Sequence, residues 1–428
     1  MIKRFLILVL FSFTVSVYGQ DAHYPPGKQR LDFAKTYFEF GARGYTSFTG
    51  KRISGNSISS FEHAHSLQPY LSWGGFHFWG HAEFFVELPL EQLRLKGSSN
   101  ADFRLNHNVV TGVRLLPWVF QEQKVRPYFG ASWASLEFSQ TPQAESKQPS
   151  HFKDFRLVTD FGFLYGYKGF VLRAGLTYSP DNTWEYPLSR TVFEQIETPA
   201  FTAQLGLLYT FDSSRNEKPE SIEKWNTYPR VSPLGSTASR AGDFFVGLGP
   251  SSSFSLSKSE YNQTVFPFLQ DKISSSGYFD MAIGYQLNKA GLFAALSFRN
   301  PVFEAEGYEV RQKIQKNSLA LEVNKHLFDY SGFAPYIGVN VAYDYIEYSE
   351  DDQGISRIAS FEQLEPGITL GWDILPGKTE EYLILRTNIR WYPFSSFDIE
   401  GTTFNFSQLE YNLIQVVFYP GRLLNARK

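Results

Sequence analysis

An internal duplication constrains the fold of this chain more than any other feature. The motif Pro-Tyr-x-Gly occurs at Pro127 and again at Pro335, and each copy starts a row in which bulky apolar residues alternate with smaller or polar ones. Residues 37–211 and 244–419 match in length and in the order of their predicted strands and turns. Such a repeat determines whether the chain forms one structural unit or two.

The first 20 residues have the pattern of a secretory signal peptide. A basic pair, Lys3 and Arg4, precedes an apolar run over residues 5–17. A transmembrane helix is the alternative, but it needs about 20 apolar residues and this run is shorter. We therefore expect export, with the signal peptide at residues 1–20 removed and the mature chain starting near Gln20 or Asp21. The sequence has no cysteine, so the exported chain must be stabilised by packing or by closure of its sheets rather than by disulfides.

The composition is rich in aromatic residues and has little net charge. Aromatic residues make up 17% of the chain, with 41 Phe and 25 Tyr, and they favour the pleated, half-buried surfaces of β-strands. The net charge of −3 provides no basic surface for nucleic acid and no polybasic membrane anchor. We therefore expect an all-β fold and no nucleic-acid partner.

A period of two residues runs through both halves from Lys35 onward. Phe38 and Phe40 alternate with Glu39 and Gly41, which indicates a strand with one apolar and one polar face. In the first repeat, residues 35–211, strands are predicted near residues 35–43, 67–73, 76–88, 104–115, 125–138, 155–166, 170–178 and 201–211. In the second repeat, residues 244–419, they are predicted near residues 244–255, 278–287, 292–303, 318–328, 333–348, 361–374, 382–392 and 404–419.

The connections between these strands alternate in length. Long polar connections are predicted at residues 50–66, 89–102, 140–152 and 179–199, and short turns at Gly74-Gly75, residues 117–124 and residues 167–169. This alternation is typical of a transmembrane antiparallel β-barrel of the outer-membrane kind, whose long loops face outward. We expect surface proteolysis to cut first near residues 146–150 or 306–316. Residues 212–243 are rich in Ser, Pro and charge and are predicted to be a linker between the repeats.

The octet at residues 204–211 joins the Pro-Tyr-x-Gly strand starts in pointing to a known family. It contains Gln204, Gly206, Tyr209 and a terminal Phe211. With these motifs, each half resembles the small eight-stranded outer-membrane β-barrels of the OmpA and OmpW type, in the form common in Bacteroidota. The octet is similar to the signal that such proteins present to the barrel-assembly machinery, whereas the last strand of the second half lacks the Gly. The resemblance implies localisation in the cell outer membrane, with outer-membrane lipid and the assembly machinery as partners.

The inward positions of the predicted strands carry most of the charge. An eight-stranded barrel is just wide enough to be filled by side chains. Opposite charges inside it must therefore pair, because an unpaired buried charge costs several kcal/mol. A charged pore wall is the alternative interpretation. The predicted interior charge network consists of Glu39, Arg43, Glu83, Arg114, Arg156, Asp160 and Arg173 in the first repeat and Glu322, Asp344, Glu365, Asp373, Arg386 and Arg390 in the second.

The histidines do not predict a metal site. His77 and His81 face the same way on one predicted strand, but four residues at roughly 3.3 Å each separate them by about 13 Å. His63 and His65 lie beside Glu62 in a predicted loop, without an evident third ligand for zinc. We therefore predict no metal ligand and no cofactor.

Two functions remain open from the sequence, and an enzyme is a more distant third. The first is a non-catalytic role in envelope integrity, in surface contact or in a complex with an unidentified envelope partner. The second is a passive channel for small solutes or hydrophobic compounds. His107 and Ser99 lie near a loop without an ordered acid partner, and no phosphate loop, HExxH motif or nucleophile elbow occurs. We therefore predict no catalytic residue.

We predict that the two repeats close into two eight-stranded barrels in tandem. Neighbouring strands of one barrel are usually joined by a short periplasmic turn, whereas the connection here spans residues 212–243. The first half also has its own assembly-signal-like octet and an interior whose charges balance well enough to fill a narrow barrel. One sixteen-stranded barrel is the alternative.

Overall fold

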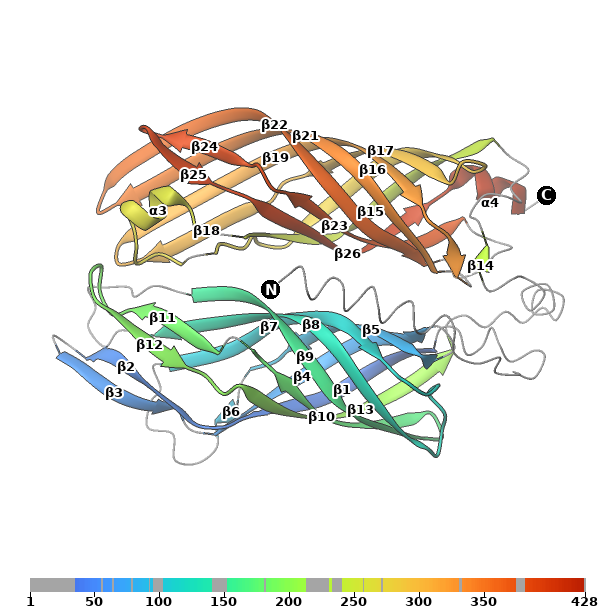
Figure 1. Ribbon diagram of the computed structural model, residues 1–428, viewed down its shortest axis with the longest axis horizontal. Helices are drawn as coiled ribbons and strands as arrows, with labels where there is room; N and C mark the ends of the chain where they lie inside the picture. The colour runs from blue at the N-terminus through green and yellow to red at the C-terminus, as the bar shows by residue number, and fades with distance from the viewer. Residues whose placement is uncertain are drawn as a thin grey trace.

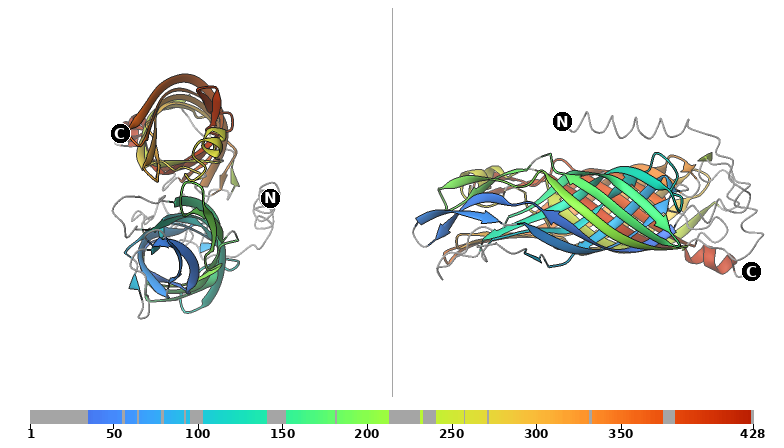
Figure 2. Two further views of the ribbon diagram at one scale, coloured as in Figure 1. Left: turned by 90° about the vertical axis from the view of Figure 1, so that its left-hand side faces the viewer. Right: turned by 90° about the horizontal axis from the view of Figure 1, so that it is seen from below.

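The computed structural model describes residues 35–54, 57–63, 65–77, 80–91, 93–94, 103–140, 152–180, 182–212, 231–232, 241–256, 258–270, 272–330, 333–374 and 382–426. The described chain is nearly all β and forms two barrels that lie side by side with their axes aligned (Figure 1). Viewed end on, they are two separate closed rings (Figure 2). No helix among the described residues is long and apolar enough to cross a membrane.

The first barrel closes on itself because its first strand pairs on both edges. β1 is hydrogen-bonded to β4 on one side and to β13 on the other, which places Gly41 opposite both Tyr70 and Gly206. The eight strands of the ring are β1 (Lys35–Tyr45), β4 (Ser66–His77), β5 (Ala82–Pro89), β7 (Phe103–Leu115), β8 (Val125–Gln140), β9 (Phe152–Tyr167), β10 (Phe170–Tyr178) and β13 (Phe201–Asp212). Three short hairpin or edge elements lie outside this ring, namely β2 with β3 (Phe48–Ser54, Ser57–His63), β6 (Leu93–Arg94), and β11 with β12 (Thr183–Pro187, Phe193–Glu197).

The second barrel closes in the same way through the pairing of β19 with β21. Its ring consists of β15 (Gly242–Ser255), β16 (Tyr278–Leu287), β17 (Leu292–Arg299), β19 (Val310–His326), β21 (Phe333–Asp352), β22 (Ile355–Ile374), β23 (Leu383–Tyr392) and β26 (Gln408–Phe418). The additional elements are β14 (Val231–Ser232), β18 (Val302–Gly307), β20 (Asp329–Tyr330), β24 with β25 (Ser396–Ile399, Thr402–Asn405), and the helices α3 (Glu260–Thr264) and α4 (Pro420–Ala426). The prediction of two tandem eight-stranded barrels is confirmed, and the sixteen-stranded alternative is wrong because each half closes separately.

The alternation along each ring strand separates a polar interior from an apolar exterior. On β16, Phe279, Met281 and Ile283 are exposed, whereas Asp280 and Ala282 between them are buried. Side chains on a strand point alternately to opposite faces, so the outer face of the ring becomes a continuous apolar surface. In lipid every backbone polar group must be paired, and a closed ring satisfies this requirement. The fold is therefore that of a transmembrane β-barrel.

The predicted turn at Gly74-Gly75 is wrong. β4 continues through both glycines to His77, where Gly74 pairs with Tyr37 on one side and Phe85 on the other. A Cβ atom on Gly74 would lie 2.5 Å from the Tyr37 hydroxyl. The glycine thus makes room for an inward tyrosine, since a glycine within a strand often marks a place where another group approaches the backbone closely. Consequently His77 and His81 are not on one strand, because His77 ends β4 and His81 lies in the turn before β5.

Several predicted loops contain paired strands. Residues 306–316 belong to the β18–β19 hairpin, whose turn is Tyr308-Glu309, residues 179–199 contain the β11–β12 hairpin, and residues 50–66 contain most of the β2–β3 hairpin. The inward row Val310, Gln312 and Ile314 is buried beyond the membrane, while the outward row there is polar. The prediction missed this extension because it searched for an apolar outward row, which only lipid contact requires.

Several predictions lie outside the described residues. These are the signal peptide at residues 1–20, the cleavage site at residues 146–150, Ser99, and most of the linker. Within the linker range, Val231–Ser232 forms β14, which pairs with β20 and extends the sheet of the second barrel.

Candidate functional site

The structure places all the predicted interior charges on the inner walls of the two barrels, where they are buried. In the first barrel these are Glu39, Arg43, Glu83, Arg114, Arg156, Asp160 and Arg173, and in the second they are Glu322, Asp344, Glu365, Asp373, Arg386 and Arg390. They occupy alternate positions on strands that are distant in sequence, so only barrel closure brings opposite charges together. The two interiors are the candidate functional sites, and each is described from its central carboxylate outward.

Glu83 is the centre of the network in the first barrel. Its carboxylate accepts hydrogen bonds from Arg173 at 2.6 and 3.1 Å, from Arg114 at 3.0 Å and from the Tyr37 hydroxyl. Arg173 also donates to Glu39 at 3.0 Å. Three of these bonds end on the Oε1 atom and one on the Oε2 atom, so both carboxylate oxygens meet a charged donor. Glu83 thereby holds two guanidinium groups across the middle of the barrel.

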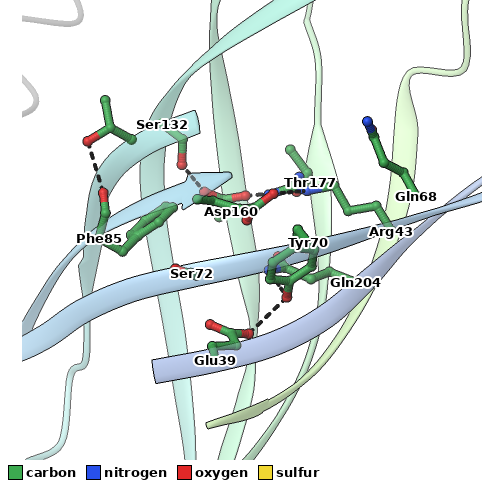
Figure 3. A network of polar contacts seen from close by, with 12 residues as sticks. Glu39, Arg43, Gln68, Tyr70, Ser72, Phe85, Ser132, Asp160, Thr177 and Gln204 are labelled. Carbon is green, nitrogen blue, oxygen red and sulfur yellow. Dashed lines mark hydrogen bonds and ion pairs between the residues drawn. The ribbon is translucent and has the colours of Figure 1, made fainter. Parts of the chain in front are cut away.

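A second branch of the same interior is built around Arg43. Its guanidinium forms a two-bond pair with Glu87, both at 2.8 Å, and donates to Thr177 at 3.0 Å. Thr177 donates in turn to Asp160 at 2.8 Å, and Ser132 also donates to Asp160 (Figure 3). Parallel Arg–carboxylate bonds of this kind are among the stronger hydrogen bonds in proteins.

The described buried charges of the first barrel balance. Four carboxylates face four guanidinium groups, namely Glu39, Glu83, Glu87 and Asp160 against Arg43, Arg114, Arg156 and Arg173. Aromatic rings fill the remaining space, for example Phe85, which lies 3.6 Å below the Arg114 guanidinium. The described interior of the first barrel thus holds equal numbers of buried carboxylates and guanidinium groups.

Two guanidinium groups, Arg386 and Arg390, hold the first of two charge clusters in the second barrel. Arg386 donates to Asp373 at 2.8 and 2.9 Å, and the His326 Nε2 atom lies 2.9 Å from the same carboxylate. Arg390 bridges two strands, because it contacts Asp280 at 2.6 Å and Glu322 at 2.8 Å. These pairs join predicted residues to His326, which the sequence prediction did not include.

Lys316 is the centre of a second cluster in this barrel. Its ammonium group lies 2.7 Å from Asp344, 3.1 Å from Glu365 and 3.5 Å from Glu410. Arg299 also pairs with Glu410. The sequence prediction missed Lys316 because the residue was assigned to a loop, and it missed Arg299 and Glu410. The alternation along β26 carried the signal for Glu410, which lies two residues from the inward-facing Gln408 and Asn412.

A buried aromatic cluster, which we call the mouth cap, fills the end of the second barrel that carries the long hairpins. It combines α3, the segment that follows it and the β24–β25 hairpin with the tips of the ring strands (Figure 1). Phe397 and Phe404 stack with ring centroids 4.8 Å apart, and Phe361 stacks on Phe397 at the same distance. The members of the mouth cap are Tyr261, Phe266, Phe268, Leu269, Ile273, Phe303, Ala305, Tyr308, Val310, Ile314, Ile346, Tyr348, Phe397, Ile399, Phe404 and Phe406.

Aromatic residues also fill the opposite ends of both barrels. In the first barrel, Phe120 from the turn after β7 stacks on Phe76 at 4.7 Å. In the second barrel, Phe245 packs against Phe293 and Tyr419. These rings lie against the Arg386 guanidinium, which is 4.0 Å from the centre of the Phe293 ring.

The predicted assembly octet lies on the last strand of the first barrel. Gln204 and Gly206 face the interior, where Gln204 donates to the Tyr70 hydroxyl at 2.7 Å. A Cβ atom on Gly206 would lie 2.0 Å from the Glu39 carboxylate, so the glycine makes room for the charge network. Tyr209 and Phe211 face outward and are 53% and 37% exposed. The octet thus has one face in the ion network and one on the apolar exterior.

The histidines singled out in the sequence lie apart from these networks. The His81 Nδ1 atom lies 2.9 Å from the Leu116 carbonyl oxygen, and His63 lies on β3, which is outside the first ring. His107 is on β7, and its side chain is outside the described set. Within the described ranges, no three His, Cys, Asp or Glu side chains are arranged to hold a metal ion.

Closed eight-stranded rings, apolar outer walls and hairpins extending beyond one end together define an outer-membrane type of β-barrel protein, here with two barrels in one chain. No protein-family model matches the chain. No curated protein matches it either.

Several solved structures are distantly similar to it. Neisserial surface protein A (NspA) is 13% identical with a TM-score of 0.31, and the match covers 42% of this chain and 99% of that one. Ail, the attachment invasion locus protein of Yersinia pestis, is 9% identical with a TM-score of 0.27 and the same coverage. OmpT of Vibrio cholerae is 7% identical with a TM-score of 0.18, covering 90% of this chain and 98% of that one. At these scores the class rests on the strand pairing of this chain itself.

Proposed function

We propose that this protein is an integral outer-membrane protein with a non-catalytic role in surface contact or in a complex at the envelope. The observation that carries this proposal is that both interiors are filled. Paired charges occupy the middle of each barrel, and the mouth cap closes one end of the second. A channel needs a continuous polar path, and a buried aromatic cluster across the mouth interrupts one.

The outer surface supports a contact role. β21 and β22 are 20 residues each, whereas about 9–11 residues cross a bilayer. Both strands therefore project well beyond the membrane. Ile355 and Ile358, at the tip of this hairpin, are 74% and 78% exposed. Exposed apolar residues at a projecting tip are suited to contact with another molecule.

Export and assembly are part of the proposal. We infer that residues 1–20 direct export and that Gln204, Gly206, Tyr209 and Phe211 present the assembly signal, with outer-membrane lipid around both barrels. The intact mass of membrane-extracted protein tests the first inference. The measured mass is expected to equal that of a chain starting near Asp21. A mass that includes Met1 would contradict export through a cleaved signal.

Conductance in a planar bilayer tests the filled interiors. The purified full-length protein is expected to give no stable open channel at neutral pH, because ion pairs occupy the middle of both barrels and the buried mouth cap lies across one end of the second. A trimeric general porin inserted under the same conditions is the positive control. Stable unitary currents from this protein would overturn the proposal and favour the channel.

One observation favours the channel as a second candidate. In the second barrel the buried side-chain amide oxygens of Asn340, Asn388 and Asn412 have no hydrogen-bond partner among the described residues. A buried amide oxygen without a partner is a place where water binds, and a line of bound water is the first requirement of a polar path. The bilayer experiment distinguishes a hydrated but closed interior from an open one.

A further inference from the structure

The β11–β12 hairpin belongs to the first barrel, yet its tip contacts the second. The tip is closed on itself, since the Leu188 N–H donates to the Val192 carbonyl at 2.8 Å. Tyr186 and Leu188 are buried although they lie outside the ring of their own barrel. Phe193, at the start of β12, packs against the mouth cap of the second barrel. We call residues 186–193 the clasp.

Arg190 makes the main polar contact of the clasp. It donates to the Tyr308 carbonyl at 2.7 and 3.1 Å, and it forms a two-bond pair with Asp352 at 2.6 and 3.3 Å. Its guanidinium also lies 5.3 Å from the centre of the Phe268 ring. One side chain of the first barrel thus contacts the β18–β19 turn, the end of β21 and the segment after α3. These three parts of the second barrel surround its mouth.

The turn that Arg190 contacts has an unusual backbone. Tyr308 and Glu309 have φ values of 49° and 69°, a left-handed conformation that two-residue hairpin turns require and that Asn and Gly usually supply. Tyrosine at such a position is uncommon and must be held by its surroundings. Here the Tyr308 carbonyl accepts from Arg190, and its hydroxyl donates to the Pro187 carbonyl at 2.6 Å. Both stabilising contacts come from the first barrel.

The two barrels also touch along the outer walls that would otherwise face lipid. Near the end opposite the clasp, Phe84 packs against Trp372 with ring centroids 5.8 Å apart. Trp133 and Phe254 make a similar contact at 5.5 Å. The end-on view on the left of Figure 2 shows the two rings next to each other, as these contacts require. The clasp is therefore the outer end of an interface that runs along the barrels.

We propose that the clasp of the first barrel holds the mouth cap of the second barrel closed. Tyr308 belongs to the mouth cap, so the strained turn, the cap and the clasp are one connected unit. Loss of Arg190 removes the contacts that hold the turn and its neighbours together, and the cap then opens more often. The first barrel thus acts as a structural partner that completes the second, which is a relation between the repeats and does not depend on the proposed surface-contact role.

Thiol labelling tests this proposal, since the natural chain has no cysteine. The reporter is Ser253→Cys, because Ser253 is fully buried on the inward face of β15. Its backbone N–H donates to Ser275, which follows the last mouth-cap residue of that segment, Ile273. A water-soluble maleimide is added to the full-length protein in detergent, and labelling is followed by mass. The change Arg190→Ala is expected to raise the labelling rate by about tenfold or more, the effect of losing hydrogen bonds to a charged group.

The matched control is Arg311→Ala. Arg311 lies on the β18–β19 hairpin that Arg190 contacts, and among the described residues its ion pairs are with exposed Glu304 and Glu306, so the change removes one positive charge without touching the clasp. This control is expected to leave the labelling rate unchanged. Tyr308→Phe is the second test variant, because it removes only the hydroxyl bond to Pro187 and keeps the ring. It is expected to raise the rate by a smaller factor.

Heat-modifiable mobility on a gel verifies that each variant is folded. If the reporter thiol is labelled at the same rate with Arg190→Ala or Tyr308→Phe as without them, the clasp does not hold the cap and the proposal is wrong. The proposal is equally wrong if the thiol at position 253 already labels at the rate of a free thiol when the clasp is intact. Neither result depends on whether the protein conducts ions, so the bilayer experiment and this one can fail separately.

Discussion

Glu83→Gln is the perturbation that most directly tests the ion-pair core of the first barrel. The change keeps the shape of the side chain and removes its charge. Glu83 accepts from Arg114, Arg173 and Tyr37, so the amide places its own N–H donors against guanidinium donors. It also leaves four guanidinium groups facing three carboxylates in a buried space.

The expected cost follows from this burial. Removing one partner of a buried ion pair typically destabilises a protein by about 3–5 kcal/mol, because the remaining charge stays desolvated. Arg173 retains Glu39 at 3.0 Å, whereas the other carboxylate near Arg114, Asp160, is 3.9 Å away. We therefore expect the lower part of that range, about 3 kcal/mol, most of it from Arg114. This is roughly a hundredfold change in the ratio of folded to unfolded protein.

Urea unfolding in detergent micelles, followed by tryptophan fluorescence and by gel mobility, measures this cost. The control is Lys51→Met, which breaks the Lys51–Glu194 pair at 2.6 Å in a solvent-exposed position of the same half. Exposed pairs contribute about 0–1 kcal/mol, so the control is expected to unfold close to the natural protein. The double change Glu83→Gln with Arg114→Met is expected to recover part of the loss, because it removes the guanidinium that was left unpaired.

A small effect would refute this reasoning. If Glu83→Gln and Lys51→Met differ by less than about 1 kcal/mol, the charges inside the first barrel are screened as surface charges are. The interior would then be hydrated, and the interpretation of a packed ionic core would have to be replaced by that of a water-filled one.

Three further predictions use the same unfolding measurement. Gly206→Ala is expected to destabilise the first barrel by about 1–3 kcal/mol through steric overlap. Gly44→Ala should not, because a Cβ atom there meets nothing within 4 Å. Equal urea midpoints for the two variants would contradict this. Burial raises the pKa of the Tyr308 hydroxyl, so the stability that this hydroxyl contributes is complete below about pH 10 and is lost as the pH rises through the raised pKa. Tyr308→Phe should abolish the part of the alkaline loss of stability that comes from Tyr308. Phe404→Ala removes a buried ring of the mouth cap and should cost about 3–5 kcal/mol, whereas Phe394→Ala, at a residue 77% exposed, should cost little.

The alternation of side chains made the walls of both barrels predictable from the sequence. The inward position of Glu83 or Arg173 follows from counting along its own strand, since the side-chain period is two wherever the strand is regular. The same counting gave eight strands in each half. It failed at Gly74-Gly75, where Gly74 accommodates Tyr37 from a neighbouring strand, and along residues 306–316, where the outward face is polar because it lies beyond the lipid.

The long connection at residues 212–243 and the octet at residues 204–211 favoured two rings, but tertiary structure decided between two rings and one and set what the charges meet. The choice depends on whether β1 pairs with β13 of its own half, and pairing between strands so distant in sequence leaves no pattern within either strand. Lys316 and its three carboxylates come from four different strands, and the clasp joins the two halves through Arg190 and Tyr308. The alternation fixes which face a residue occupies, but the residue it meets there is set by register and closure, which are properties of the whole barrel.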